Sequence, residues 1–347
     1  MEFVSRQELG AETWNAFVDS SDEAWFWHRS EYVEALTTWP GRSDESFAVV
    51  DRGSGYRIIA VLPLHGVEVR RARVVRWRVL DSQGGIATAN GVGAQHRSRV
   101  VQAVREHLLD VARERQAVEV TLALPPMAPA YRGDRCPRVN PLLVFGGENT
   151  LTQTWVVDLR KPLDTIRSRY SSGAREELRR IAGEPVEIRE ASGETDLATY
   201  YNLHCKTYRR TGVSPHPRAY FEHIFGKIAS HRLARILFCT RGDDVVAAQS
   251  SVFYKDAGIY WTSASAQTAK SGETRALIDE QIRYARERGV EWFEAGEAFP
   301  NATSGKLKGL SDFKRSFGGE LFPLYRSRLV TRRRAHALSE SLRAIRS

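Results

Sequence analysis

The chain has 347 residues, more than one hydrophobic core usually holds, which predicts two domains. Hydrophobic residues make up 42% and charged residues 27%, a balance typical of folded proteins that argues against extended disorder. The net charge of +9 is compatible with RNA, nucleotide-linked substrates, coenzyme phosphates or an anionic membrane surface as partners, and equally with an arginine-rich solvated surface.

The cysteines and the apolar patterning exclude several classes of protein. Cys136, Cys205 and Cys239 are far apart and form no Cys-x-x-Cys pattern, so neither a disulfide framework nor a zinc site is expected. No long uninterrupted apolar window occurs, and residues 1–6 lack the features of a secretory leader. We therefore expect a cytoplasmic protein.

Two stretches of the chain, roughly 180 residues apart, follow the same order of predicted elements, which indicates an internal repeat. Each begins with a hairpin, predicted at 46–53 and 56–64 in the first copy and at 235–241 and 245–253 in the second. Each continues into an amphipathic helix, with apolar residues at helical spacing over 101–111 and over 278–285.

Both predicted helices end in the same tetrapeptide, Ala-Arg-Glu-Arg, at 112–115 and at 285–288. A strand beginning Val-Glu follows each, at 118–120 and at 290–292, and Gly289 is expected to end the second helix in a left-handed conformation. The shared position of these identical residues favours duplication over coincidence.

The predicted fold class is α/β (α+β), with two tandem domains that each hold a mixed sheet flanked by helices. Proline and glycine between 125 and 147 mark the crossing between the copies, and a strand at 154–159 opens the second. The boundaries are expected at 1–150 for the first domain and 151–321 for the second.

Three segments in the second half resemble the Fem family of aminoacyl transferases, which are similar to tandem Gcn5-related acetyltransferase domains. They are the strand and arginine-rich helix over 157–181, the segment over 207–221 that contains Tyr-Phe, and Phe-Lys-Arg-Ser-Phe-Gly-Gly at 313–319. The third segment is the most specific.

This resemblance implies that an amino acid esterified to transfer RNA is attacked by an amine, giving an amide without metal or cofactor. Family members extend peptidoglycan cross-bridges, and relatives build peptide-like natural products. The implied partners are aminoacyl-tRNA and a small amine or peptide acceptor, nucleotide-linked in some members, with peripheral membrane contact as a further option. The resemblance also implies that residues 322–347 return to complete the first domain.

By resemblance, Lys314 and Phe313 are catalytic. A fixed ammonium near the ester carbonyl would stabilise the oxyanion that forms when the amine attacks. The structural alternative is a surface lysine beside two phenylalanines that anchor the core.

Four residues are candidates for contacts with substrate phosphates. Arg175 and Arg179 lie four apart on a predicted helix, a like-charge pair that a phosphate between them would stabilise. Tyr220 and His216 match the position where family members use a tyrosine and a basic residue. A histidine is a weaker and pH-dependent phosphate ligand, so the acceptor is expected to differ from the usual cell-wall precursor.

Tyr260 and Ser265 match an aromatic strand of the family and are predicted substrate contacts. Strict alternation would place Tyr260, Thr262 and Ala264 on one face and Trp261, Ser263 and Ser265 on the other. The resemblance also implies a general base, because the family usually has an acid shortly after a Gly-Pro pair in the first domain. This chain has Gly84-Gly85 there, and no carboxylate follows. Either Asp81 or Glu297, or substrate and water, would therefore take the amine's proton.

Two rival functions stay open. An acyl-coenzyme A-dependent N-acyltransferase would need backbone amides at a helix N-terminus for the pyrophosphate, and Glu273 in the corresponding loop would repel it. A non-catalytic RNA-binding or membrane-associated scaffold would use the positive charge, including Arg332-Arg333-Arg334.

Overall fold

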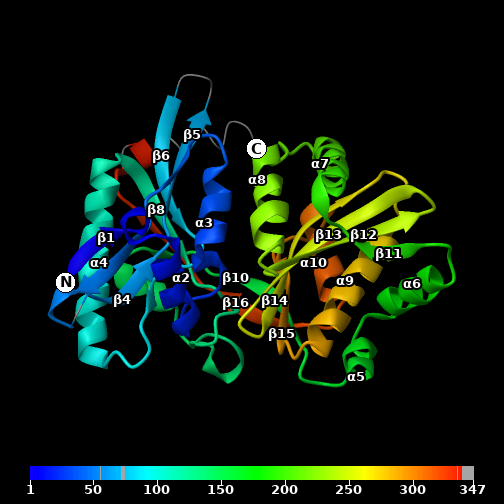
Figure 1. Ribbon diagram of the computed structural model, residues 1–347, viewed down its shortest axis with the longest axis horizontal. Helices are drawn as coiled ribbons and strands as arrows, with labels where there is room; N and C mark the ends of the chain where they lie inside the picture. Colours follow the sequence, from blue (N-terminus) through cyan, green and yellow to red (C-terminus); the bar gives the residue numbers. More distant parts are fainter. Residues whose placement is uncertain (55, 72–74, 334, 338–347) are drawn as a thin grey trace. The chain divides into compact units, whose positions relative to one another are not determined.

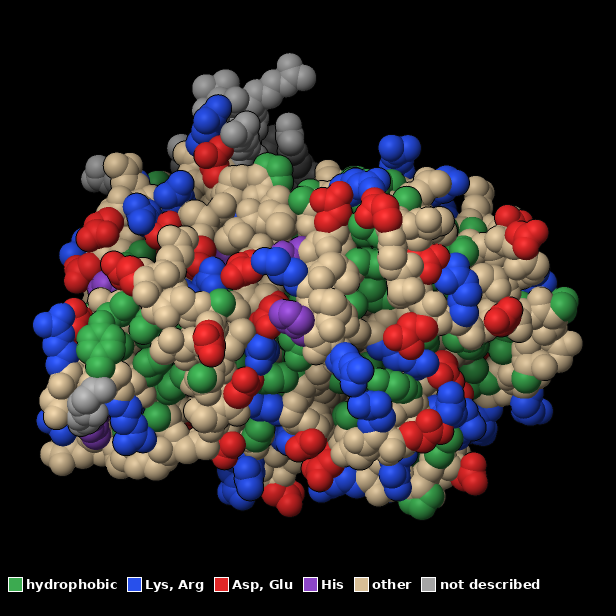
Figure 2. Space-filling view, viewed as in Figure 1, with side chains coloured by type: hydrophobic (Ala, Val, Ile, Leu, Met, Phe, Trp, Pro, Cys, Tyr) green, Lys and Arg blue, Asp and Glu red, His purple; other side chains and the backbone are tan. Residues whose placement is uncertain are grey.

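The computed structural model describes residues 1–347 apart from 55, 72–74, 334 and 338–347. The chain divides into two compact units, Met1–Leu151 with Leu324–Ser347, and Thr152–Pro323 (Figure 1). No helix within the described ranges is both long and apolar enough to cross a membrane. On the face shown in Figure 2, basic and acidic side chains are interspersed.

The first unit contains two sheets, in strand orders β1-β3-β4-β7 and β2-β5-β6-β8-β17-β9. Its strands are β1 (Glu2–Ser5), β2 (Arg42–Asp44), β3 (Phe47–Asp51), β4 (Arg57–Leu62), β5 (His65–Arg71), β6 (Val75–Ser82), β7 (Ala87–Thr88), β8 (Ala117–Ala123), β9 (Glu148–Asn149) and β17 (Arg326–Val330). Its α-helices are α1 (Arg6–Leu9), α2 (Ala11–Ser20), α3 (Ser30–Thr37) and α4 (Ala94–Glu114), and short 3-10 turns lie at Phe26–His28, Arg52–Ser54, Gly133–Arg135 and Pro141–Phe145.

The end of the chain contributes β17 to the first unit. This strand pairs antiparallel with β8 on one side, from Arg326 opposite Ala123 to Val330 opposite Glu119, and with β9 on the other. Strand β17 is thus an inner strand of the first unit's larger sheet.

The second unit has one sheet in the order β11-β12-β13-β14-β15-β10-β16. Its strands are β10 (Thr152–Asp158), β11 (Glu187–Glu190), β12 (Ala234–Arg241), β13 (Asp244–Tyr254), β14 (Ala257–Ser265), β15 (Trp292–Ala298) and β16 (Glu320–Leu324). Its helices are α5 (Leu163–Ser168), α6 (Ser172–Ala182), α7 (Gly193–Arg210), α8 (Arg218–His223) with a π-helical turn at Ile224–Ala229, α9 (Ser271–Glu287) and α10 (Gly305–Arg315).

Helices cover both faces of this sheet, as consecutive residues of β12 show. Leu237 packs in a cluster with Leu277 of α9, whereas the ring of Phe238 stacks against Tyr200 of α7 at 6.3 Å. Because neighbouring strand residues point to opposite faces, α9 and α7 lie on opposite sides. A second cluster on the α9 side joins Ile278 and Ile282 to Tyr170 and Phe317.

The predicted repeat is confirmed at the level of its elements. Both hairpins form, as β3–β4 and β12–β13. Helices α4 and α9 both end at the glutamate of Ala-Arg-Glu-Arg, with Arg115 and Arg288 as caps. Gly289 has the expected positive φ of 76°, and Gln116 adopts a φ of 52° in the first copy. The second strand begins two residues later than predicted, at Trp292, because the Val290 N–H bonds to Ala285 at the helix end.

Candidate active site

Strands β14 and β15 run parallel but pair over a short distance. The ladder joins Ala257–Ile259 to Trp292–Glu294 and ends there, although both strands continue. On its other side, β15 stays paired with β10 along its whole length. The part of β15 beyond Glu294 therefore has one sheet neighbour, β10, in the described chain, and α10 packs against this strand.

A β-bulge changes which side chains of β15 share a face. The register shifts so that Trp155 lies opposite Gly296 and Val156 opposite Glu294, and Gly296 has a φ of 110°. Glu294 accepts a hydrogen bond from the Thr154 hydroxyl at 2.7 Å, and Glu297 accepts one from the Thr152 hydroxyl at 3.0 Å. Since Thr152 and Thr154 are two residues apart on one strand, both glutamates lie on the same face.

Lys314 lies against this bulge. Its ammonium Nζ donates to the backbone oxygen of Glu297 at 2.9 Å and lies 5.3 Å from the ring centre of Phe299. A Cβ at position 296 would be 3.0 Å from Lys314 Cε and 3.1 Å from Nζ. The absence of a side chain at Gly296 is therefore what admits the lysine to the strand.

The charge of Lys314 is set by its surroundings. Burial lowers the pKa of the ammonium below its ordinary value, and the carboxylates of Glu297 and Glu294 act in the opposite direction. A half-buried lysine with a lowered pKa titrates more readily than a surface lysine. The side chain can thus present a poorly hydrated positive charge, which interacts strongly with a developing anion.

Phe313, the residue before Lys314, anchors α10 to the core. Its ring meets Phe317 edge-on at 5.5 Å and lies 6.5 Å from the ring of Tyr260. The Arg275 guanidinium lies 5.1 Å from the same ring and forms an ion pair with Glu177 of α6 at 2.5 Å. Phe313 therefore packs the helix end that carries Lys314 against the core.

The predicted alternation along β14 is wrong between Tyr260 and Thr262. A bulge places Ser251 opposite Tyr260 but Ser250 opposite Thr262, with Trp261 as the extra residue. The Tyr260 hydroxyl consequently reaches Ser263, while the Thr262 hydroxyl meets Tyr200 of α7 at 2.7 Å. Tyr260 faces the cluster that contains Phe313, and its burial raises the pKa of its hydroxyl.

His216 and Tyr220 belong to an aromatic cluster on the α7 side. The His216 backbone N–H donates to Nε2 of His204, a fully buried residue of α7, at 3.0 Å. The His216 ring lies 5.5 Å from Tyr220, which is itself buried and meets Trp261 at 5.9 Å. The sequence missed His204, although its spacing on α7 with buried Leu197 and Tyr200 marks it as an inward-facing position.

Ser265 lies at the end of β14 and is held by α7. Its backbone N–H donates to the Thr207 hydroxyl at 3.0 Å, and its carbonyl accepts from the same hydroxyl at 3.0 Å. Arg210 donates to the Ser265 carbonyl at 3.2 Å and to its hydroxyl at 3.3 Å. These contacts make Ser265 a junction between strand and helix.

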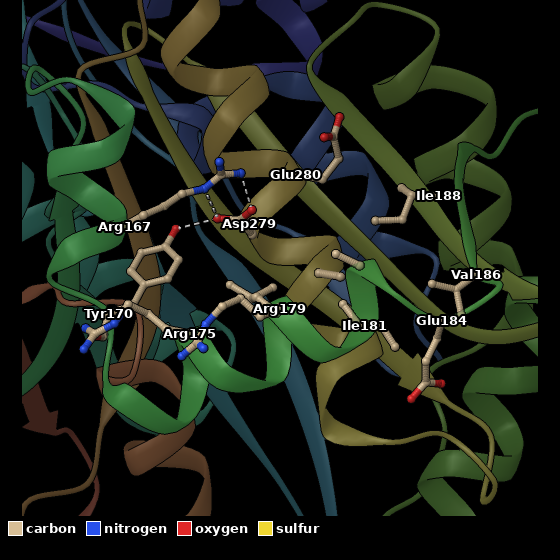
Figure 3. A pocket seen from close by; sticks show the side chains of 13 residues that line it. Arg167, Tyr170, Arg175, Arg179, Ile181, Glu184, Val186, Ile188, Asp279 and Glu280 are labelled. Carbon is tan, nitrogen blue, oxygen red and sulfur yellow. Dashed lines mark hydrogen bonds and ion pairs between the residues drawn. The ribbon is translucent and has the colours of Figure 1, made fainter.

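Arg175 and Arg179 lie on α6, as predicted, and line a pocket of about 650 Å³ in the second unit (Figure 3). Arg167 and Asp279 lie at the same pocket, joined by two hydrogen bonds. This pocket is separate from the residues around Lys314 described above, since neither Lys314 nor Glu297 lines it.

Comparisons with known proteins bear on the fold. An acetyltransferase (GNAT) domain family matches residues 167–315. The crystal structure of FemX superimposes with a TM-score of 0.69 at 13% identity, covering 97% of this chain and 99% of that one. The chain has the FemX-like tandem acetyltransferase fold.

Two further solved structures share the FemX-like fold. L-PGS from Bacillus licheniformis matches with a TM-score of 0.57 at 13% identity, covering 96% of this chain and 95% of that one. A tandem GNAT protein from the clavulanic acid biosynthesis pathway matches with a TM-score of 0.54 at 12% identity, covering 95% and 98%. The search of curated proteins gave no match.

Within this FemX-like fold, the two candidate bases lie in different units. Asp81 is in β6 of the first unit, where Oδ1 accepts from the Thr121 hydroxyl at 2.5 Å. Glu297 lies beside Lys314 in the second unit. Sequence reasoning missed Glu294, a buried carboxylate on the same face. The available signal was that Glu294 and Glu297 are the only charged residues of an otherwise apolar strand, Trp292–Ala298.

Proposed function

We propose that this chain is an aminoacyltransferase that moves an amino acid from aminoacyl-tRNA to an amine and forms an amide bond. The observation that carries the proposal is the half-buried ammonium of Lys314, held on the Glu297 carbonyl over Gly296. The FemX-like fold supports the same reaction class by resemblance. The acceptor is a small amine or peptide, as in cell-wall peptides or peptide-like natural products.

In the proposed reaction, a neutral amine attacks the ester carbonyl carbon and a C–N bond forms. The carbonyl oxygen becomes an oxyanion, which the Lys314 ammonium stabilises. The ester C–O bond then breaks, and the ribose hydroxyl of the tRNA leaves with a proton. The amine loses a proton in exchange, so no ATP, metal or redox cofactor is consumed.

Glu297 is the preferred acceptor of that proton. Its carboxylate is partly exposed, and its own carbonyl accepts a hydrogen bond from Lys314, so the proposed base and the oxyanion donor meet at the β15 bulge. Buried Glu294 would assist by raising the pKa of Lys314, which keeps the lysine positively charged. Asp81 remains the second candidate base.

The other predicted residues keep proposed supporting roles. Tyr260 and Ser265 would border the donor, and His216 with Tyr220 would border the acceptor. Arg175 and Arg179 would bind a substrate phosphate, either of the tRNA acceptor stem or of a nucleotide diphosphate, because arginine binds phosphate bidentately.

The acyl-coenzyme A alternative is disfavoured by the N-terminus of α9. Glu273 is fully buried there, its carboxylate accepts the Lys270 N–H at 2.7 Å and it pairs with Arg241 at 2.6 Å. A carboxylate thus occupies the helix end that would have to bind pyrophosphate. On the face that Figure 2 shows, the basic side chains are mixed with acidic ones, so this face gives a scaffold role no support.

The test is transfer by the full chain from radiolabelled aminoacyl-tRNAs to extract amines, with acyl-coenzyme A in a parallel reaction. Lys314→Ala should lower the single-turnover rate by about 100-fold or more. Lys306→Ala is the matched control, an exposed lysine of the same helix, and should retain the rate. Consumption of acyl-coenzyme A instead of aminoacyl-tRNA, or full activity of Lys314→Ala, would overturn the proposal.

A further inference from the structure

The pocket beside α6 combines charge with an aliphatic wall. Arg175 and Arg179 contribute from α6, and Ala276, Asp279 and Glu280 contribute from α9. Figure 3 shows these side chains together with Val186 and Ile188 from the segment after α6. A volume of about 650 Å³ is in the range that holds small organic ligands.

The acidic residues of this pocket are already neutralised. Asp279 pairs with Arg167 at 2.5 Å and accepts from the Tyr170 hydroxyl at 3.1 Å. Glu184 pairs with Arg241 at 2.7 Å and also with Lys270 at 3.0 Å.

Glu280, the third acid, pairs with Arg283 at 2.7 Å and with Arg235 at 3.2 Å. None of the three carboxylates is thus left to neutralise the α6 arginines.

The arginines of α6 are not neutralised. Arg175 donates through Nη1 to two backbone carbonyls, of Ser168 and Tyr170, which carry no charge. Among the described residues, the Arg179 side chain has no hydrogen-bond or ion-pair partner, and this residue is exposed. The remaining guanidinium N–H donors of Arg175 and Arg179 form a positively charged rim at the pocket.

The wall below this rim is aliphatic. It consists of Leu178, Ile181, Ala182, Val186, Ile188 and Ala276. Such side chains offer no hydrogen-bond partners to the ring nitrogens of a nucleobase, but they bury hydrocarbon favourably. We infer that this pocket binds a phosphate ester with a short aliphatic chain, its head on Arg175 and Arg179 and its chain against the aliphatic wall.

This inference rests on the proposed function only in assigning the phosphate to a substrate. It narrows the substrate that carries this phosphate to an amphipathic phosphate ester. Binding itself is measured without turnover, so its failure is distinguishable from failure of the transferase proposal.

Calorimetric titration of the full chain with hexyl phosphate, inorganic phosphate and hexanol separates head from chain. Hexyl phosphate should bind about tenfold more tightly than inorganic phosphate, and hexanol more weakly than either. Equal affinity for inorganic phosphate and hexyl phosphate would show that the pocket does not bind the aliphatic chain and would overturn that part of the proposal. Tighter binding of adenosine monophosphate than of hexyl phosphate would show that the pocket is a nucleotide site and would overturn the proposal.

Matched variants test the contacts. Arg179→Gln should weaken hexyl phosphate binding about tenfold, and Arg179→Lys should recover part of it. Arg180→Gln, an equal charge change on the adjacent exposed residue that does not line the pocket, should alter binding less than twofold. Equal effects of the two glutamine variants would show only general charge attraction and overturn the site.

A third variant tests the wall. Ala182→Phe, at an exposed position of the lining, should fill the pocket and weaken hexyl phosphate while leaving inorganic phosphate unchanged. Unchanged hexyl phosphate affinity in this variant, with thermal unfolding like that of the wild type, would contradict the proposed chain position.

Discussion

Replacing Gly296 with alanine tests how the β15 bulge positions Lys314. The residue has a φ of 110°, where an L-amino acid is strained by about 1–3 kcal/mol. The new Cβ would also lie 3.0 Å from Cε and 3.1 Å from Nζ of Lys314, closer than ordinary van der Waals contact. The lysine must move away, and its hydrogen bond to the Glu297 carbonyl must lengthen or break.

A displacement of about 1 Å at a reacting group can cost about 100-fold in rate. We therefore expect Gly296→Ala to lower single-turnover aminoacyl transfer by about 10- to 100-fold, with a modest loss of stability in denaturant unfolding. Gly289→Ala is the control: its φ of 76° imposes backbone strain, but no described atom lies within 4 Å of the new Cβ. That variant should lose stability and keep its rate.

A double-mutant cycle with Lys314→Ala completes the experiment. If Gly296 acts through the lysine, Gly296→Ala should cause little further loss once Lys314 is absent. A wild-type rate for Gly296→Ala, or the same fold loss with and without the lysine, would refute the positioning role.

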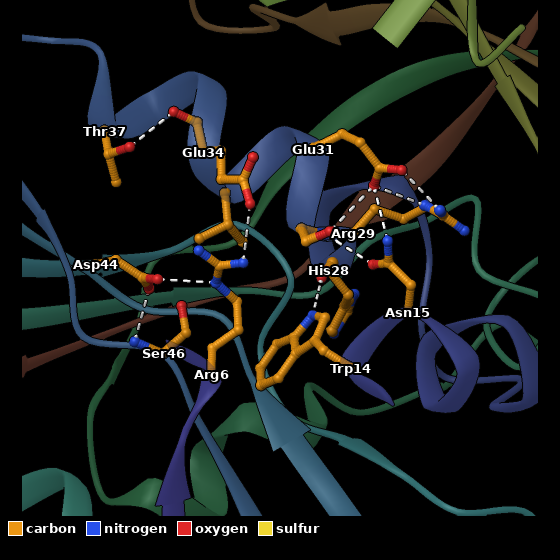
Figure 4. A network of polar contacts seen from close by, with 12 residues as sticks. Arg6, Trp14, Asn15, His28, Arg29, Glu31, Glu34, Thr37, Asp44 and Ser46 are labelled. Carbon is orange, nitrogen blue, oxygen red and sulfur yellow. Dashed lines mark hydrogen bonds and ion pairs between the residues drawn. The ribbon is translucent and has the colours of Figure 1, made fainter. Parts of the chain in front are cut away.

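Three other perturbations have defined outcomes. Glu297→Gln removes a charge that raises the pKa of Lys314, so the alkaline limb of the rate profile should move to lower pH; an unmoved limb contradicts the coupling. Burial and the neighbouring His216 imidazole lower the pKa of His204 in the folded protein to about 4, whereas the pKa in the unfolded chain is 6.5. As the pH falls from 6.5 to about 4, the unfolded chain binds a proton that the folded protein does not bind, and stability is lost. Unfolding free energy should drop by about 3 kcal/mol across that window in the wild type, and His204→Gln should lack this part of the drop in urea titrations. Arg6→Met breaks a buried ion pair with Asp44 at 2.8 Å (Figure 4) and should cost about 3–5 kcal/mol, largely recovered by adding Asp44→Asn; a loss below about 1 kcal/mol would contradict this.

Local patterns predicted much of the fold correctly. The hairpins, the long amphipathic helices and the strands after them are encoded by near-neighbour spacing and turn residues. Helices α4 and α9 end at the same tetrapeptide because the cap residues follow directly in sequence.

The candidate site was less predictable, because it depends on register. Strict alternation misplaced Thr262 relative to Tyr260, and it would also have separated Glu294 from Glu297. One extra residue in a strand reverses the facing of every later side chain. Whether that residue is accommodated is decided by hydrogen bonds to the partner strand, which adjacent sequence does not encode.

The sequence by itself determined the order of elements, the repeat and the chemical character of each segment, since these follow from short-range spacing of apolar, charged and turn-forming residues. Only the tertiary structure decided that Lys314 rests on Gly296, that Glu294 and Glu297 share one face of β15 and that Glu273 occupies the N-terminus of α9. These facts arise from contacts between residues far apart in the chain. Packing and strand pairing select them, and no local pattern carries that information.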